Sequence, residues 1–177
     1  MKMADKYIYL YGIRFAGKTC ILETLKQNKT IIEAKPTLAI NMDRLEINEL
    51  VFKVWDTPGQ PSLLRLTWTQ FKNMGLINAT EALIFILDTA DEENFKVAKE
   101  EFLEVLNDKA CKGKDLIFCF HKMDLQEAKD NLQEAKDLFD LNSIKKRMVY
   151  VVETSVKTLD SICELKNKLY SLSIANI

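Results

Sequence analysis

The feature that most constrains this chain is a glycine-bounded segment near its amino terminus, which reads Gly12-Ile13-Arg14-Phe15-Ala16-Gly17-Lys18-Thr19. The segment matches the pattern G-x-x-x-x-G-K-[ST]. Residues 6–11 before it are rich in β-branched and aromatic side chains, and residues 18–28 after it carry apolar side chains at helical spacing. The pattern therefore lies between a predicted strand and a predicted helix, which is the context that a phosphate-binding loop requires.

The spacing within this loop has a mechanical reason. Backbone N–H groups of the loop and of the helix N-terminus face inward around the phosphates of a bound nucleotide. We expect the Lys18 ammonium between the β- and γ-phosphates and the Thr19 hydroxyl on a Mg²⁺ ion. The residues predicted to bind nucleotide here are Gly12, Arg14, Phe15, Ala16, Gly17, Lys18, Thr19 and Cys20. For this motif alone, a chance match on a turn before a helix remains the alternative.

Strand and helix patterns alternate along the rest of the chain. The expected strands are an antiparallel hairpin of residues 40–47 and 50–55 and three apolar runs at 82–87, 116–120 and 148–152. Each apolar run predicts a central strand that is buried on both faces. The expected helices cover residues 92–107, 126–141 and 159–172. Together they predict one α/β domain over all 177 residues, with a mostly parallel six-stranded sheet, one antiparallel edge hairpin and helices on both faces.

A second motif, Asp56-Thr57-Pro58-Gly59-Gln60, follows the predicted strand 50–55 directly. At this position the Asp56 carboxylate can reach Mg²⁺ through a water molecule, and the Gly59 N–H can meet a γ-phosphate. Gln60 lies where a side chain can orient the attacking water, and Pro61 biases the backbone of Gln60 toward an extended conformation. Such a turn is common by itself, but downstream of a phosphate loop it predicts a second anchor for the nucleotide.

A third motif, His121-Lys122-Met123-Asp124, ends the predicted strand 116–120, at the carboxyl edge where open α/β sheets bind ligands. A carboxylate accepts two hydrogen bonds, and guanine offers N1–H and N2–H₂ side by side, whereas adenine presents no such pair of donors. Asp124 is therefore predicted to select guanine. The other residues predicted to bind the nucleotide at this end are His121, Lys122 and, from a fourth and weaker motif after the last strand, Ser155, Val156 and Lys157.

Taken in this order, the four motifs resemble the motif set of the small GTPases of the Ras superfamily. Residues 16–22 and 54–56 are similar to the Arf branch, whereas residues 121–125 and the long stretch 60–81 resemble the Rag branch. The resemblance covers nearly the whole chain and implies a P-loop NTPase fold of the small G domain type. It also implies a molecular switch that binds GTP or GDP with Mg²⁺ and hydrolyses GTP slowly.

The resemblance further implies a switch threonine in the loop between the first helix and the second strand. Thr37 is the favoured candidate and Thr30 the alternative, and the switch threonine would ligate Mg²⁺ in the GTP state. The loops around Thr37 and Gln60 are then expected to order around the γ-phosphate and to relax after hydrolysis. On this basis the expected metal ligands are Thr19, Thr37 and Asp56, and the expected catalytic residues are Gln60, Lys18 and Thr37.

Several departures limit what the resemblance implies. His121 stands where most of the superfamily has an asparagine that braces the phosphate loop, so weaker retention of the nucleotide is expected. The segment before Lys6 is shorter than the amphipathic membrane helix of Arf proteins, residue 2 is not glycine, and neither a prenylation cysteine nor a Rag-like second domain follows the last helix. We therefore expect a cytoplasmic protein with no direct membrane anchor, so that any contact with a membrane is made through partners.

The net charge and two residues of the motifs narrow the classes of partner and of function. The net charge of −1 lacks the basic surplus that phosphate backbones attract, so no nucleic-acid partner is expected. An effector, an exchange factor and a GTPase-activating protein are expected but not identified, and the chain is expected to be a monomer or a nucleotide-dependent dimer. Two functions remain as alternatives to the cycling GTPase. One is a scaffold that binds nucleotide without hydrolysing it, and the other is an ATP-using P-loop enzyme. Gln60 favours the GTPase, and the ATP-using enzyme would have to explain Asp124.

Overall fold

One six-stranded sheet forms the centre of the molecule, in the order β2-β3-β1-β4-β5-β6. The computed structural model of the chain describes residues 6–35, 37 and 39–175. The strands are β1 Lys6–Tyr11, β2 Asn41–Ile47, β3 Leu50–Asp56, β4 Thr80–Asp88, β5 Asp115–His121 and β6 Val149–Thr154. The hairpin partners β2 and β3 pair antiparallel, and all other neighbours pair parallel. The predicted fold class, including the antiparallel edge hairpin, is confirmed.

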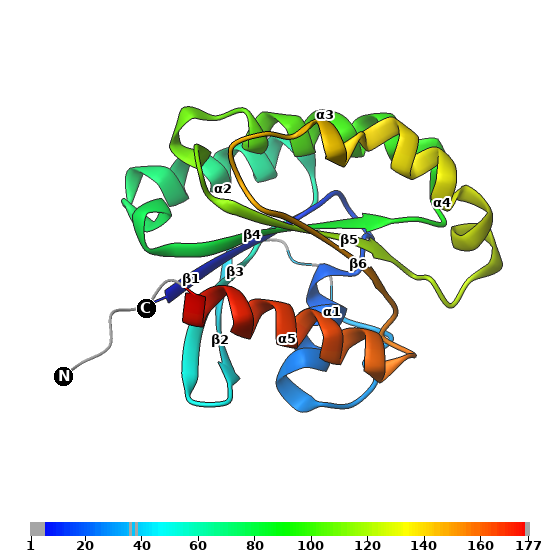
Figure 1. Ribbon diagram of the computed structural model, residues 1–177, viewed down its shortest axis with the longest axis horizontal. Coiled ribbons are helices and arrows are strands. Elements are labelled where there is room, and N and C mark those ends of the chain that lie inside the picture. The colour runs from blue at the N-terminus through cyan, green and yellow to red at the C-terminus, as the bar shows by residue number, and fades with distance from the viewer. Residues whose placement is uncertain (1–5, 36, 38, 176–177) are drawn as a thin grey trace.

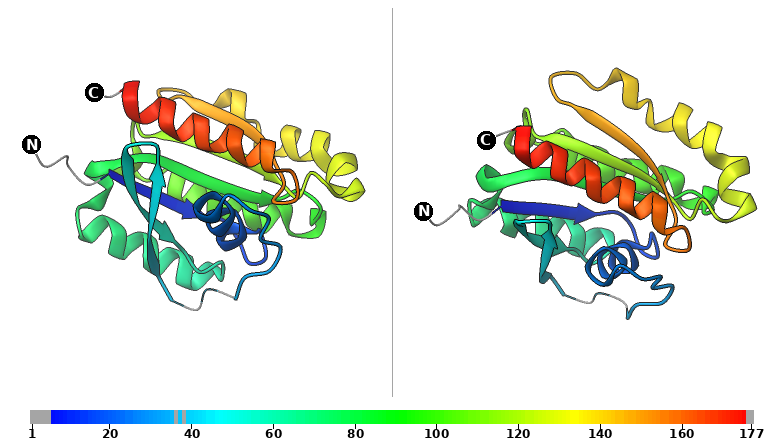
Figure 2. Two further views of the ribbon diagram at one scale, coloured as in Figure 1. Left: turned by 90° about the horizontal axis from the view of Figure 1, so that it is seen from below. Right: turned by 60° about the horizontal axis from the view of Figure 1, so that its bottom comes forward.

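Helices cover both faces of this sheet (Figure 1). The helices are α1 Lys18–Gln27, α2 Pro61–Asn73, α3 Phe95–Leu106, α4 Gln126–Phe139 and α5 Leu159–Ala175. Short 3₁₀ turns occupy Leu76–Ala79, Glu92–Asn94, Lys109–Cys111 and Leu141–Ser143. Helices α1 and α5 lie side by side over one face, which both views of Figure 2 show, and α2, α3 and α4 cover the other. Among the described residues, none of the helices combines the length and the apolar character needed to cross a bilayer.

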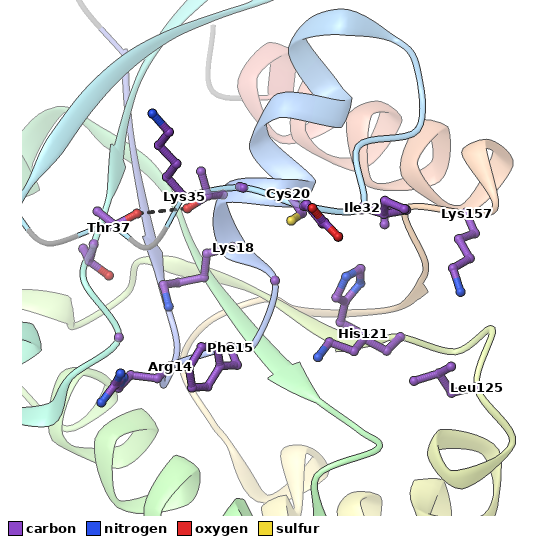
Figure 3. A pocket seen from close by; sticks show the side chains of 18 of the residues that line it. Arg14, Phe15, Lys18, Cys20, Ile32, Lys35, Thr37, His121, Leu125 and Lys157 are labelled. Carbon is purple, nitrogen blue, oxygen red and sulfur yellow. Dashed lines mark hydrogen bonds between the residues drawn. The ribbon is translucent and has the colours of Figure 1, made fainter.

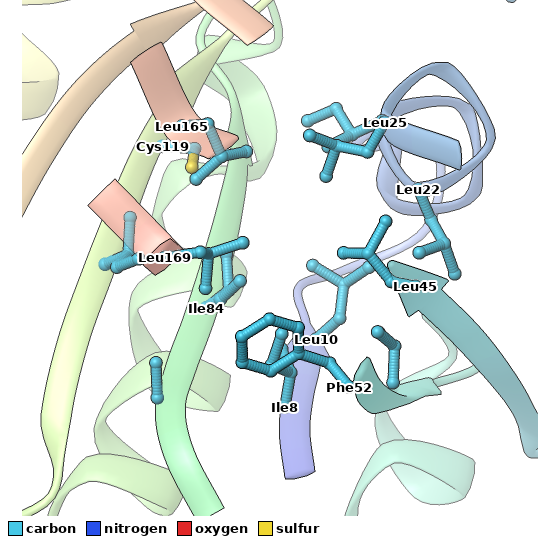
Figure 4. Close-up of a cluster of buried hydrophobic side chains, with 14 of the residues drawn as sticks. Ile8, Leu10, Leu22, Leu25, Leu45, Phe52, Ile84, Cys119, Leu165 and Leu169 are labelled. Atoms are coloured by element: carbon cyan, nitrogen blue, oxygen red, sulfur yellow. The ribbon is translucent and has the colours of Figure 1, made fainter. Parts of the chain in front are cut away.

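The two faces of the sheet bury different cores. Ile8 and Leu10 of β1 point to an aliphatic cluster beneath α1 and α5, which Figure 4 shows together with Phe52 and Leu165. Their neighbours in sequence point to the opposite face, because successive side chains of a strand alternate. That face carries a cluster of aromatic rings: Tyr9, Tyr11, Trp55, Trp68, Phe71, Phe85, Phe102, Phe118 and Phe139. The strands between the two clusters therefore lack polar alternation, as predicted for β4 and β5.

The last strand departs from this pattern. The run 148–152 was predicted to be buried on both faces, and this prediction is wrong, because β6 is an edge strand. Met148 is 58% exposed and Val151 43% exposed, whereas Val152 is buried. An apolar run shows that a segment favours the extended conformation, but it does not show whether a further strand or helix covers its second face.

Helix α2 was not predicted, because the stretch 60–81 was noted only for its length. The helix begins at Pro61, where a missing N–H and a fixed φ are compatible with the first turn. Leu64, Trp68 and Phe71 are buried at a helical spacing of four and three residues, which is a signal that the sequence does contain. The signal is weakened by polar residues between these positions, among them two threonines, which have a low helix propensity.

Two groups of polar contacts hold α2 against its neighbours. Arg65 pairs with Glu101 and Glu104 of α3, each at 2.8 Å, and the Glu101 carboxylate is almost fully buried. At the other end of α2, the Trp68 indole N–H donates to Asp108 Oδ2 at 3.0 Å, and Lys72 pairs with the same carboxylate. The helix is thus tied both to α3 and to the loop that follows it.

Candidate functional site

A cleft of about 610 Å³ opens where the parallel strands end at their carboxyl edge. Loops that follow β1, α1, β3, β5 and β6 form its wall, part of which Figure 3 shows. The predicted site residues in this wall are Arg14, Phe15, Gly17, Lys18, Thr19, Cys20, Thr37, Gly59, Gln60, His121, Lys122, Asp124, Val156 and Lys157. Four others, Gly12, Ala16, Asp56 and Ser155, are buried and do not line it.

The phosphate loop holds a buried cation at one end of the cleft. Gly17 takes the left-handed conformation, φ 93°, directly before α1, so the positive end of the helix dipole faces the loop. Lys18 Nζ donates to the carbonyl oxygens of Gly12 at 2.8 Å and Ile13 at 2.9 Å. Burial lowers the pKa of Lys18 to about 8. The loop thus keeps an ammonium group in place before any anion arrives.

Three oxygen-bearing side chains converge beside this lysine. Thr19 Oγ1 lies 2.7 Å from Asp56 Oδ2 and 3.0 Å from Thr37 Oγ1, and Thr37 Oγ1 lies 3.3 Å from the same carboxylate oxygen. Burial raises the pKa of Asp56, against the hydrogen bond from Thr19. Its second oxygen, Oδ1, is buried without a partner among the described residues. Hydroxyl and carboxylate oxygens suit a hard divalent cation, so the group fits Mg²⁺.

The position of Thr37 bears on the choice between two switch threonines. Thr37 belongs to this oxygen cluster, whereas Thr30 is exposed near the end of α1. Its neighbour Pro36, which also drew attention in the sequence, lies outside the described residues. The geometry of the described residues thus favours Thr37 as the third oxygen ligand.

The segment after β3 packs directly on the phosphate loop. A Cβ atom on Gly59 would lie 2.5 Å from the Arg14 nitrogen, so a side chain there would collide with backbone. Thr57 anchors the start of the segment, because its hydroxyl donates to the Leu10 carbonyl at 2.9 Å. Gln60 is exposed and extended, with φ −75° and ψ 127°, as the following proline predicts. These contacts bring Gln60 to the phosphate end of the cleft.

Arg14 and Phe15 form an exposed pair on the same loop. Phe15 has φ 62°, a conformation that bulky residues rarely adopt, and the residue is 72% exposed. The Arg14 guanidinium lies 5.2 Å from the centre of this ring, and Figure 3 shows it directed away from Lys18. Arg14 therefore rests on Phe15 and not over the phosphate end of the cleft.

We predict that Arg14→Ala changes intrinsic GTP hydrolysis by less than about tenfold, because an outward guanidinium does not meet the transition-state charge. An arginine acting in cis is worth on the order of 10³ to 10⁵ in rate. Single-turnover hydrolysis measures the difference, with nucleotide affinity as the control. A loss beyond a hundredfold at unchanged affinity would show that Arg14 turns inward during the reaction.

Asp124 marks the opposite end of the cleft. The Ser155 hydroxyl donates to Asp124 Oδ1 at 2.6 Å, and Lys157 Nζ lies 2.9 Å from Oδ2. Burial alone would raise the pKa of Asp124, but these hydrogen bonds hold it below its usual value. The carboxylate is thus ionised and oriented, which is the state needed to accept two hydrogen bonds.

His121 occupies the space between Asp124 and the phosphate loop. Its Nδ1 lies 2.9 Å from Thr154 Oγ1, and a Cβ atom on Gly17 would lie 2.6 Å from its Cδ2. Burial, together with the neighbouring Lys122 charge, lowers the pKa of His121 to about 4, so the ring is neutral near pH 7. The ring edge therefore supports the phosphate loop by direct packing on Gly17. Whether nucleotide is held less tightly than with asparagine stays a prediction.

Two supporting residues, Asp88 and Ser161, were not predicted, and the role of Thr154 from the fourth motif was not predicted either. Asp88, the last residue of β4, accepts a hydrogen bond from Lys122 Nζ at 2.5 Å. Thr154 holds the histidine, and the Ser161 hydroxyl accepts from the Ser155 backbone N–H at 2.9 Å. Asp88 follows the buried run 82–87 at the same edge as the known motifs, so its position in the sequence could have revealed it.

Known proteins resemble this chain in sequence and in fold. The model of the ADP-ribosylation factor family matches residues 2–172. ADP-ribosylation factor 1 of Brassica rapa subsp. pekinensis and ADP-ribosylation factor 3 of Arabidopsis thaliana are each 32% identical over 147 residues, which is 83% of this chain and 76% of each relative. The Arl6 BBS3 small GTPase of Trypanosoma brucei, solved with the nucleotide analogue GppNp, superposes with a TM-score of 0.75 at 20% identity, over 95% of this chain and 98% of that one. The last comparison concerns the fold alone.

Proposed function

Because this chain belongs to the ADP-ribosylation factor family, we propose that it is a guanine-nucleotide switch that binds GTP and GDP with Mg²⁺ and slowly hydrolyses GTP. One observation carries the proposal. A single cleft has a buried ammonium beside three converging oxygen ligands at one end and an ionised, oriented carboxylate at the other. This pairing suits a ligand with a polyphosphate at one end and a base with two adjacent donors at the other.

The phosphate end accounts for slow hydrolysis. Lys18 supplies a fixed positive charge, and the Gly59 N–H follows a segment that is anchored to β1 through Thr57. The exposed Gln60 can orient a water molecule for attack on the γ-phosphate. Thr19 and Thr37 would ligate Mg²⁺ directly and Asp56 would reach it through water, and the bound ion would supply positive charge that stabilises the phosphates during hydrolysis. With Arg14 directed outward, no arginine of this loop adds to that charge.

Intrinsic hydrolysis on the order of 10⁻⁴ to 10⁻² per second is the expected result for a switch that lacks a partner's arginine. The first measurement is the identity of the nucleotide that copurifies with the protein, followed by single-turnover hydrolysis of GTP. Protein that retains GTP unchanged would favour the nucleotide-binding scaffold, and displacement of labelled GDP by similar concentrations of ATP would contradict the base assignment.

Replacing Gln60 with leucine should slow this reaction by about tenfold or more, because the side chain that positions the water is lost. Single-turnover rates of the variant and the wild type are compared at saturating Mg²⁺. Gln70→Leu is the matched control, since Gln70 is an exposed residue of α2 that does not line the cleft. Equal rates for Gln60→Leu and wild type would remove Gln60 from the mechanism.

Members of this family generally act with effectors, exchange factors and GTPase-activating proteins. We propose that this chain does so as well, as a cytoplasmic protein. The residues before Lys6, on which the expectation of no amphipathic helix rests, lie outside the described residues. The resemblance of residues 121–125 to the Rag branch also stays a prediction, because both relatives named above are ADP-ribosylation factors.

A further inference from the structure

The end of the sheet opposite the cleft collects basic side chains from neighbouring loops. These loops lead into β4, β5 and β6, at the end of the sheet away from the arrowheads in Figure 1. Arg147 Nη2 donates to the Leu106 carbonyl at 3.2 Å, and Lys114 Nζ donates to the Asn78 carbonyl at 3.2 Å, so the loops adjoin one another. We call this surface the basic pole, and its cations are Lys109, Lys112, Lys114, Lys145, Lys146 and Arg147.

Within the described residues, no cation of the basic pole forms an ion pair with a carboxylate. Lys114, Lys145 and Arg147 donate to backbone carbonyl oxygens, which carry no net charge. The exposed side chains of Lys109, Lys112 and Lys146 make no hydrogen bond or ion pair within the described parts of the chain.

Acidic groups near the basic pole offset only a small part of this charge. Asp108 already pairs with Lys72, and Asp115 accepts from the Met148 backbone N–H but keeps its negative charge, which stands against the six cations of the pole. Elsewhere on the surface, lysines such as Lys26 and Lys136 pair with carboxylates. A chain with a net charge of −1 therefore concentrates positive charge at one end.

Apolar side chains accompany this charge. Met74, two residues after Lys72, is 63% exposed, and Met148, next to Arg147, is 58% exposed. Cationic side chains beside exposed apolar ones are typical of surfaces that meet the headgroup region of a bilayer. A nucleic acid would use the charges but would leave both methionines in water, whereas the headgroup region of a bilayer accommodates both.

We propose that the basic pole binds the surface of an anionic phospholipid membrane, with Met74 and Met148 reaching the headgroup region. In this orientation the nucleotide cleft lies at the far end of the sheet and stays open to solvent. The contact is made by the folded domain itself, whereas the sequence led us to expect membrane contact through partners. It does not depend on which nucleotide the cleft holds.

The test compares binding of the full chain to vesicles of phosphatidylcholine alone and to vesicles that also contain phosphatidylserine. Each basic residue near an anionic surface raises the partition coefficient about fivefold, so Lys109→Gln, Lys112→Gln and Lys146→Gln combined should weaken binding by about 100-fold. The matched control is Lys29→Gln, Lys96→Gln and Lys129→Gln, which removes the same net charge from exposed lysines outside the basic pole.

Binding to the mixed vesicles that falls with added salt, is lost in the first triple variant and persists in the control supports the proposal. Met74→Gln with Met148→Gln should weaken binding further at salt concentrations that screen the charges. Absence of binding by the wild type, or equal loss in both triple variants, overturns the proposal. Guanine-nucleotide binding by each variant shows that it is folded, so a failure here is separate from a failure of the nucleotide assignment.

Discussion

Replacing Lys18 with alanine is expected to weaken GTP and GDP binding by roughly 30- to 5,000-fold, the range of about 2–5 kcal/mol for truncating one partner of a buried charge pair. Lys18 is the buried cation of the phosphate loop, already held by two carbonyl oxygens. Its loss leaves the phosphates without a fixed countercharge. Dissociation rates of fluorescent GDP and GTP analogues measure the effect.

A control separates lost binding from lost folding in this experiment. Lys29→Ala removes an exposed lysine at the end of α1 that does not line the cleft, and it should leave both dissociation rates nearly unchanged. Circular dichroism shows whether Lys18→Ala retains its helices despite the two carbonyl oxygens left without a donor. A folded Lys18→Ala protein with wild-type dissociation rates would contradict the phosphate-loop assignment.

The second large effect is expected from Asp124→Asn, which should lower GTP affinity by roughly 10² to 10⁴ and raise affinity for xanthosine triphosphate. The wild-type carboxylate offers two acceptors to the two donors of guanine. An asparagine amide offers one acceptor and one donor, which suits xanthine, where an oxygen replaces the amino group. Competition of each triphosphate against labelled GDP gives the ratio of affinities.

Asp137→Asn is the matched control for this change, because Asp137 is an exposed carboxylate on α4 that does not line the cleft. It should keep the preference for guanine. If Asp124→Asn also keeps that preference, the base lies elsewhere in the cleft, and the contacts of Ser155 and Lys157 with Asp124 serve structure and not recognition.

Local patterns predicted most of the sheet, because apolar runs and turn residues report directly on strands. The runs around Ile84 and Phe118 gave two central strands correctly, and the loop ending in Lys18 gave the first strand and helix. The run at 148–152 misled, since hydrophobicity does not reveal whether a neighbour covers the second face. The α2 helix was missed although Leu64, Trp68 and Phe71 have helical spacing.

For the site, too, short local motifs were predictable from the sequence, whereas contacts between distant segments were not. Motifs predicted many of the residues that line the cleft, because their chemistry is tied to short, fixed spacings. The residues that orient them come from distant segments, as Thr154 does for His121 and Asp88 does for Lys122. Such partners are set by strand order and register, which a single sequence does not specify.

The ion pairs and the hydrogen bond that fix α2 limit which part of the surface can change between nucleotide states. Arg65 fixes the helix to α3, and Lys72 and Trp68 fix its far end, so rearrangement around Gln60 is expected to stop within the first turn. The outer side of α2, near the exposed Leu66, would then keep the same surface in both nucleotide states. A partner that distinguishes the two states would instead have to contact the few residues before the helix.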